Sequence, residues 1–215
     1  MTSVDTLDTV NKFDVITRIC DLRWTDLDQA DLLRLAQGYY YFSVQFRENL
    51  QLACELYPSD ARLKELEKQE CNTANLSPWP GVAAANEKMN HDEFVRRLLN
   101  LSPAQETTRS YLEDLGQTYL AAIRKIAPAV RAMSIGSYEG GGLERVFRAF
   151  LRAPDWENPA LKAFEHFLLE HIRFDSDPDD GHGALSRHLA PDDRVVPLWA
   201  EFERLLIKSV PKLAT

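Results

Sequence analysis

The sequence predicts an all-α fold, arranged as a single domain of about seven helices. Apolar residues recur at intervals of three and four along most of the chain, which is the period of an amphipathic helix. No segment shows the strict alternation, bounded by turn residues, that a half-buried strand requires. A chain of 215 residues with 45% hydrophobic and 27% charged residues has the composition of one globular domain. We expect this domain to span residues 1–215, with residues 1–24 as an N-terminal extension.

The first helix is expected at residues 27–57. Thr25 or Asp26 can cap its start, because a side-chain oxygen there accepts a hydrogen bond from the first turn. Pro58 follows its end. At roughly 30 residues it is more than twice as long as an average globular helix, so we expect it to form one wall of the core.

The next segments differ in composition. A helix is expected at residues 59–71, capped by Ser59 or Asp60. Because it is mostly charged, we expect it to be a solvated connector. Residues 72–81 contain two prolines and a glycine, which exclude a regular helix, so Trp79 is expected in a loop.

Four further helical regions follow. One is expected at residues 82–101. Ser102–Pro103 predicts the start of the next, since proline is favoured at the first helical position. We expect Pro128 to kink this helix, and Gly136 and glycines 140–142 to interrupt it, before helical spacing resumes at residues 143–150. Asn158–Pro159 repeats the start signal for a helix to about residue 175. A last helix is expected at residues 195–207.

The composition also argues against several functions. Acidic residues outnumber basic ones by 33 to 25, giving a formal net charge of −8, so the positive field that attracts nucleic acid is missing. The cysteines Cys20, Cys54 and Cys71 are odd in number and far apart, unlike a disulfide framework or a thiolate zinc site. No apolar run approaches the ~18 residues of a membrane span. We expect a cytoplasmic protein that binds neither nucleic acid nor membrane.

Polar residues interrupt the apolar face of the helix at residues 158–175. Its stripe of apolar residues continues into His171 and then Asp175, four residues later. Burying an unpaired imidazole and carboxylate costs several kcal/mol, so something must compensate them. A buried histidine–aspartate hydrogen bond or a helix-end ion pair would suffice, but His182, between two glycines, offers a third ligand for a metal.

Two other apolar stripes also lead to polar residues. The stripe at residues 143–150 leads back to Glu139, and the stripe of the 82–101 helix leads back to His91 and then Glu87. In an alternative interpretation, Asn90 caps a helix that begins at His91, and Glu87 then lies outside it. Both interpretations stay open at this point.

Three inward carboxylates and three histidines would form a mixed oxygen and nitrogen ligand set. Such a set suits iron or manganese better than structural zinc. The ferritin-like architecture is disfavoured because no Glu-x-x-His sequence occurs. His166 lies about 140° around its helix from His171, so we do not expect it to be a ligand.

These residues resemble the heme-oxygenase-like di-iron oxidases and oxygenases, which share the helical heme oxygenase fold but bind non-heme iron. The pattern of that family is a glutamate, a histidine shortly after it, a second glutamate on another helix and then His-x-x-x-Asp-x-x-His. Here Glu139 precedes His171 by 32 residues, and His171 to Asp175 has the spacing His-x-x-x-Asp. The resemblance extends to residues 39–46, which look like the first core helix of the fold.

The chain departs from the family pattern at two ligands. Six residues separate Asp175 from His182, where the family has two, so either His182 or His188 is the candidate for the last ligand. The first carboxylate can be Glu70, just before the 72–81 loop, or Glu87, nearer to His91.

The resemblance implies that two non-heme iron ions activate O₂, as co-substrate, to oxidise a small organic substrate such as an amine or amino-acid derivative. Proteins of this fold are often homodimers. Arg145 and Arg173 are expected to be surface residues. Candidate walls of the substrate cavity are Tyr39, Tyr40, Phe42, Phe46, Trp79, Phe147 and Phe167.

The same fold also supports other functions. A metal-free enzyme similar to thiaminases (TenA-like) or to cofactor-biosynthesis relatives would use acids and histidines directly, and a thiaminase would need a nucleophilic cysteine, for which Cys54 and Cys71 are the candidates. In a non-catalytic interaction protein, the inward polar residues would only bond to one another. Heme binding is disfavoured because no histidine precedes His91.

Overall fold

The computed structural model of the protein describes residues 11–74, 76–175 and 181–214, and over these it is predominantly helical, as predicted. Residues Cys71–Thr73 (β1) and Met89–Asn90 (β2) pair as a short antiparallel ladder, which the sequence did not predict. No helix in these ranges is both long enough and apolar enough to cross a bilayer. The α-helices are α1 (Lys12–Cys20), α2 (Gln29–Leu56), α3 (Ala61–Glu70), α4 (His91–Leu99), α5 (Glu106–Arg124), α6 (Pro128–Ser137), α7 (Leu143–Phe150), α8 (Pro159–Asp175), α9 (His182–Ser186) and α10 (Val196–Ser209).

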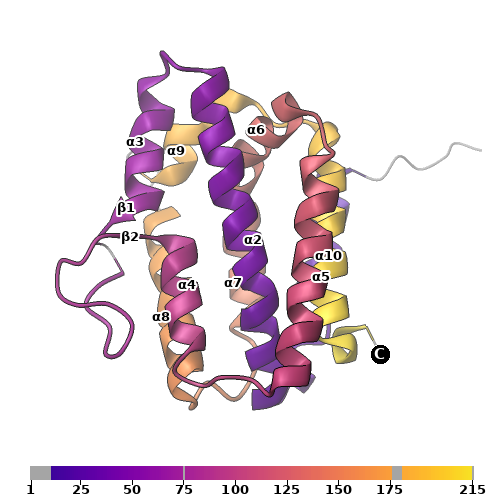
Figure 1. Ribbon diagram of the computed structural model, residues 1–215. Coiled ribbons are helices and arrows are strands. Elements are labelled where there is room, and N and C mark those ends of the chain that lie inside the picture. Colours follow the sequence, from indigo (N-terminus) through magenta and orange to yellow (C-terminus); the bar gives the residue numbers. More distant parts are fainter. Residues whose placement is uncertain (1–10, 75, 176–180, 215) are drawn as a thin grey trace, which may run out of the picture.

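The long helix α2 is the centre of the bundle. Helices α4, α5, α6 and α10 pack against it, and Figure 1 shows it running between the α4–α8 pair and the α5–α10 pair. The predicted length is confirmed, but the predicted caps Thr25 and Asp26 are wrong. These residues belong to a 3₁₀ turn, and Asp28 caps α2 instead through a hydrogen bond from the backbone N–H of Asp31.

Aromatic side chains fill the core between α2 and the helices behind it. The Tyr39 ring of α2 contacts Phe147 of α7 and Phe167 of α8, with ring centroids 5.7 and 5.8 Å apart. Phe42, one helical turn later, stacks on Phe202 of α10 at 4.1 Å. Each such ring, when fully buried, contributes about 1.5–3 kcal/mol, so these contacts fix α7, α8 and α10 relative to α2.

The same core continues into the segment expected to be an N-terminal extension. Val15 and Ile19 of α1 are fully buried, and α1 packs against α7 and α10. Trp24 is also buried, and its indole N–H donates to the carbonyl of Ile19. Residues 11–24 therefore form part of the bundle.

Two predicted helix starts are wrong. The helix expected from residue 82 begins at His91, as in the alternative interpretation, although the Asn90 side chain makes no capping hydrogen bond. The residues before it form turns and the β2 strand. The helix expected from Pro103 begins at Glu106, since the Ser102 hydroxyl donates to Asn158 rather than capping a helix. The start at Asn158–Pro159 is confirmed, with Asn158 Oδ1 accepting from the N–H of Ala160.

Helix α3 is not the solvated connector predicted from its charge. Leu63 and Leu66 are fully buried, and Glu70 at its end is only 4% exposed. Pro128 likewise starts a new helix, α6, rather than kinking the previous one. The predicted interruption after α6 is confirmed as a kinked turn, η2 (Tyr138–Gly142), in which the backbone leaves helical geometry and Gly141 has a φ of +92° that favours glycine.

Candidate metal centre

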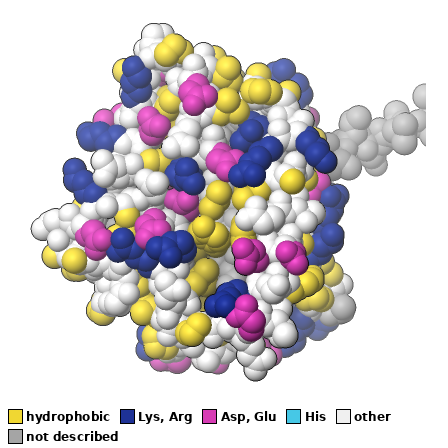
Figure 2. Space-filling view, in the orientation of Figure 1, with side chains coloured by type: hydrophobic (Ala, Val, Ile, Leu, Met, Phe, Trp, Pro, Cys, Tyr) yellow, Lys and Arg dark blue, Asp and Glu magenta, His cyan; other side chains and the backbone are white. Residues whose placement is uncertain are grey.

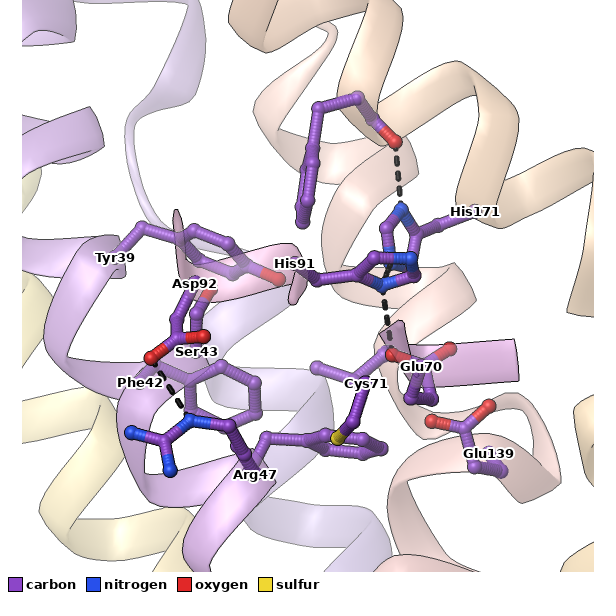
Figure 3. A pocket seen from close by; sticks show the side chains of 13 residues that line it. Tyr39, Phe42, Ser43, Arg47, Glu70, Cys71, His91, Asp92, Glu139 and His171 are labelled. Carbon is purple, nitrogen blue, oxygen red and sulfur yellow. Dashed lines mark hydrogen bonds and ion pairs between the residues drawn. The ribbon is translucent and has the colours of Figure 1, made fainter. Parts of the chain in front are cut away.

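Five buried acids and histidines meet where α3, α4, η2, α8 and α9 converge. All five residues are less than one-tenth exposed. Figure 3 shows four of them from the pocket side. They are Glu70 at the end of α3, His91 at the start of α4, Glu139 in η2, His171 in α8 and His182 at the start of α9.

Glu70, His91 and His171 form the tightest part of the cluster. Each offers a ligand atom within 4.8 Å of the others. Nδ1 of His91 lies 2.7 Å from Oε2 of Glu70 and 3.0 Å from Nε2 of His171. Nδ1 of His171 lies 2.7 Å from the carbonyl oxygen of Phe167, one turn earlier in α8. When this Nδ1–H donates to the carbonyl, Nε2 keeps its lone pair and faces the cluster, as in many histidine ligands.

His182 joins Glu70 to Glu139. Its Nδ1 lies 3.0 Å from Oε1 of Glu70 and 3.3 Å from Oε2 of Glu139. The two oxygens of Glu70 therefore face different histidines, Oε2 towards His91 and Oε1 towards His182.

The close packing of α9 on η2 places His182 beside Glu139. A Cβ atom on Gly183 would lie 2.8 Å from the backbone oxygen of Glu139, closer than side-chain carbons approach. Glycine at this position thus lets α9 approach the turn that carries Glu139.

The electrostatics of the cluster favour an ionised Glu70. Burial alone would raise the pKa of its carboxyl, but the charges and hydrogen bonds of His91 and His182 hold that pKa well below the usual 4.5. Cys71 behaves differently: burial, and then the neighbouring Glu70 carboxylate, raise the pKa of its thiol to about 12. The pocket therefore holds a carboxylate suited to a cation and a thiol that stays protonated.

A pocket opens beside the cluster, with an empty volume of about 360 Å³ including the part open to solvent. Of the predicted walls, Tyr39, Phe42, Phe46 and Phe167 line it, whereas Tyr40, Trp79 and Phe147 do not. The prediction that Trp79 covers it is wrong, because the Trp79 ring stacks on His166, with centroids 4.6 Å apart. The other lining residues are Ser43, Arg47, Glu70, Cys71, His91, Asp92, Glu139, Leu143 and His171.

The structure separates the two candidates for the first carboxylate. Glu87 lies outside α4 and is about one-third exposed, with Oε1 2.7 Å from Nη1 of Arg97. Glu70, and not Glu87, lies with His91. Asp175 is the last residue of α8, and its side chain lies outside the part that the structure describes.

The remaining predicted residues are accounted for elsewhere. Nε2 of His188 lies 2.5 Å from Oδ2 of Asp60 at the start of α3, so His182 and not His188 joins the cluster. Arg145 donates to the hydroxyl of Thr17, and Arg173 pairs with Glu170 on the same helix. Both arginines are surface residues, as expected.

Sequence reasoning did not single out three polar residues of the pocket. Ser43 and Arg47 lie one turn apart on α2, and Asp92 follows His91 directly on α4. The helical spacing of Ser43 and Arg47, four residues apart on α2, was the available signal.

Comparisons of the chain with protein families, with characterised proteins and with solved structures found no significant match. Function is therefore inferred from the geometry of the cluster and its pocket, together with the resemblance of the residue pattern.

Proposed function

We propose that the protein is a non-heme iron oxidase or oxygenase of the heme-oxygenase-like type, which uses O₂ to oxidise a small organic substrate. The observation that carries the proposal is the position of Glu70, whose two carboxylate oxygens face two different histidines. Glu70 would therefore hold a metal ion together with either histidine.

The donor groups fit this assignment. One metal position would use Glu70 with His91 and His171, and the second would use Glu70 with His182 and Glu139. Imidazole nitrogens and carboxylate oxygens together suit iron or manganese. Nδ1 of His91 faces two groups at once, Glu70 and His171, and a cation between them would satisfy all three.

Bound iron would supply the electrons and the coordination positions that O₂ activation needs. The chain's own residues do the rest. The Phe167 carbonyl holds the His171 ring in one orientation, and Gly183 permits the close packing that positions His182. Tyr39, Phe42 and Phe46 form apolar walls, which limit water around a reacting substrate.

One observation bears on the metal-free alternative, because Cys71 lines the pocket. A nucleophilic cysteine requires a depressed pKa, which a cationic neighbour or a helix N-terminus provides. Cys71 instead follows the C-terminal end of α3 and lies beside a carboxylate, with a pKa of about 12. The arrangement therefore favours a metal site over cysteine chemistry.

The decisive experiment is to titrate metal-free protein with ferrous iron under anaerobic conditions, count the bound iron and then admit O₂. We expect about two equivalents of iron per chain and a transient visible absorption after mixing. His171→Ala and His182→Ala should each lower the iron content. His188→Ala is the matched control, because that histidine pairs with Asp60 outside the cluster. Absence of iron binding, or equal binding by all variants, would refute the proposal.

A further inference from the structure

Two buried polar atoms in the pocket have no hydrogen-bond partner within the described ranges. They are the hydroxyl of Ser43 on α2 and Oδ1 of Asp92 on α4. The two residues are only 6% and 8% exposed, and both line the pocket beside the cluster of acids and histidines. Buried polar atoms without partners are rare, and leaving one unpaired costs free energy. Their presence together in one pocket points to a ligand.

The other oxygen of Asp92 is already occupied. Nε of Arg47 donates to Oδ2 of Asp92 at 2.9 Å, and Nη1 of Arg47 donates weakly to Gln51 at 3.4 Å. Figure 3 shows Ser43, Asp92 and Arg47 on the opposite side of the view from Glu70 and Glu139. The pocket thus has a polar end without metal-type histidines, distinct from the proposed iron ligands.

The chemistry of this end selects a cationic donor. A carboxylate oxygen only accepts hydrogen bonds, so the ligand must carry an N–H or O–H group for Asp92. The Ser43 hydroxyl accepts as well as donates, so a group with several N–H donors, such as an ammonium, can bond to both residues. The rings of Tyr39 and Phe42, which also line the pocket, attract a cation through their faces. A ligand carboxylate is disfavoured at this end. It would be repelled by the open oxygen of Asp92, and the charge of Arg47 is already paired with Asp92.

We propose that Asp92 and Ser43 form the binding subsite for the ammonium group of a small primary amine, whose carbon chain extends along the aromatic walls towards the iron cluster. That this amine is the substrate to be oxidised rests on the proposed function; that an amine binds here does not.

The test measures binding of three probes of similar size, n-propylammonium, 1-propanol and propanoate, to metal-free and to iron-loaded protein by calorimetry. The ammonium should bind at least about tenfold more tightly than the other two, because hydrogen bonds to charged groups are the stronger ones. Asp92→Asn should remove most of this preference. Ser43→Ala should weaken ammonium binding severalfold while leaving the fold intact, because its hydroxyl has no partner to lose.

A matched control keeps the test specific to the pocket. Asp31→Asn also neutralises a buried aspartate, but one that pairs with Lys212 far from the pocket, so it should leave ammonium binding unchanged. Preference for propanoate, or equal ammonium binding by wild type, Asp92→Asn and Ser43→Ala, would overturn the subsite. Ammonium binding without iron binding would uphold the subsite and refute the iron oxidase. Iron binding without ammonium binding would refute the subsite and leave the iron oxidase standing.

Discussion

The contact between α9 and η2 gives a prediction that needs no metal and no substrate. In Gly183→Ala, the new methyl group would lie 2.8 Å from the backbone oxygen of Glu139. A backbone oxygen cannot rotate away as a side chain can, so α9 must move back from the turn. Gly140→Ala is the matched control on the other side of the same contact. Its φ is −74°, which alanine accepts, and no atom lies within 4 Å of its added Cβ.

The two variants should change stability in opposite directions. Overpacking costs about 1–3 kcal/mol, from which the better helix propensity of alanine at residue 183 recovers up to about 1 kcal/mol. Taking the middle of the overpacking range, about 2 kcal/mol, less this recovery, we expect Gly183→Ala to lower the free energy of unfolding by about 1–2 kcal/mol, which lowers Tm by about 2–8 °C in a chain of this size. Gly140→Ala should raise it by up to about 1 kcal/mol, because alanine restricts the unfolded chain.

Urea unfolding followed by circular dichroism measures both variants against wild type. Under the proposed function, Gly183→Ala should also bind less iron than wild type, because retreat of α9 withdraws His182 from Glu70 and Glu139. A Gly183→Ala protein as stable as wild type, or one whose stability changes in the same direction and by the same amount as that of Gly140→Ala, would refute the argument that this contact holds α9 in place.

Three further predictions concern single side chains. Ser43→Ala should leave Tm unchanged or raise it, because the Ser43 hydroxyl has no hydrogen-bond partner. Ser134→Ala should lower the free energy of unfolding by about 1–2 kcal/mol, because the Ser134 hydroxyl both accepts and donates a hydrogen bond. Thermal unfolding of both variants measures the difference. Hydrogen bonds from two neighbouring arginines lower the pKa of Glu93 to about 2 from 4.5, so its contribution is present above about pH 4.5 and is lost as pH falls towards 2. Because Glu93 is partly exposed, Glu93→Gln should cost only about 1 kcal/mol at pH 7, and denaturation series at several pH values should show the difference narrowing below pH 4.5. Burial raises the thiol pKa values of Cys54 and Cys71 to about 11 and about 12, so few of these thiols are ionised at pH 8. Both should react slowly with a thiol-reactive reagent in the native protein and rapidly after unfolding. A colorimetric assay of reacted thiols measures the two rates.

Helical spacing was sufficient to find the inward-facing members of the cluster on long apolar stripes. His171 follows Phe164 and Leu168 on α8, and Glu139 precedes the buried residues of α7; both are buried where the spacing placed them. A polar residue is conspicuous in such a stripe because its neighbours are hydrocarbon. Asp92 was not conspicuous, since an acid in the first turn of a helix is ordinary and its only sequence neighbour in the cluster is His91.

Contacts between residues far apart in the sequence could not be predicted. The residues of the polar end come from α2 and α4, and nothing in the sequence says that Arg47 meets Asp92 across 45 residues. The predicted helix start at Pro103 was wrong for a similar reason. The Ser102 hydroxyl was available as a cap until the fold brought Asn158 beside it, 56 residues later. Tertiary hydrogen bonds thus overrode local capping preferences.

The choice between Glu70 and Glu87, in contrast, was decidable from spacing. Leu63, Leu66 and Glu70 stand at steps of three and four, so Glu70 interrupts an apolar stripe as Glu139 does on its own helix. The high charge of α3 hid this stripe, because an amphipathic helix with one narrow apolar face has a polar average composition. Glu87 lies on no such stripe once the helix begins at His91, which leaves it exposed and free to pair with Arg97. A carboxylate on a narrow apolar stripe is therefore the better guide to a buried ligand than a carboxylate near a histidine in sequence.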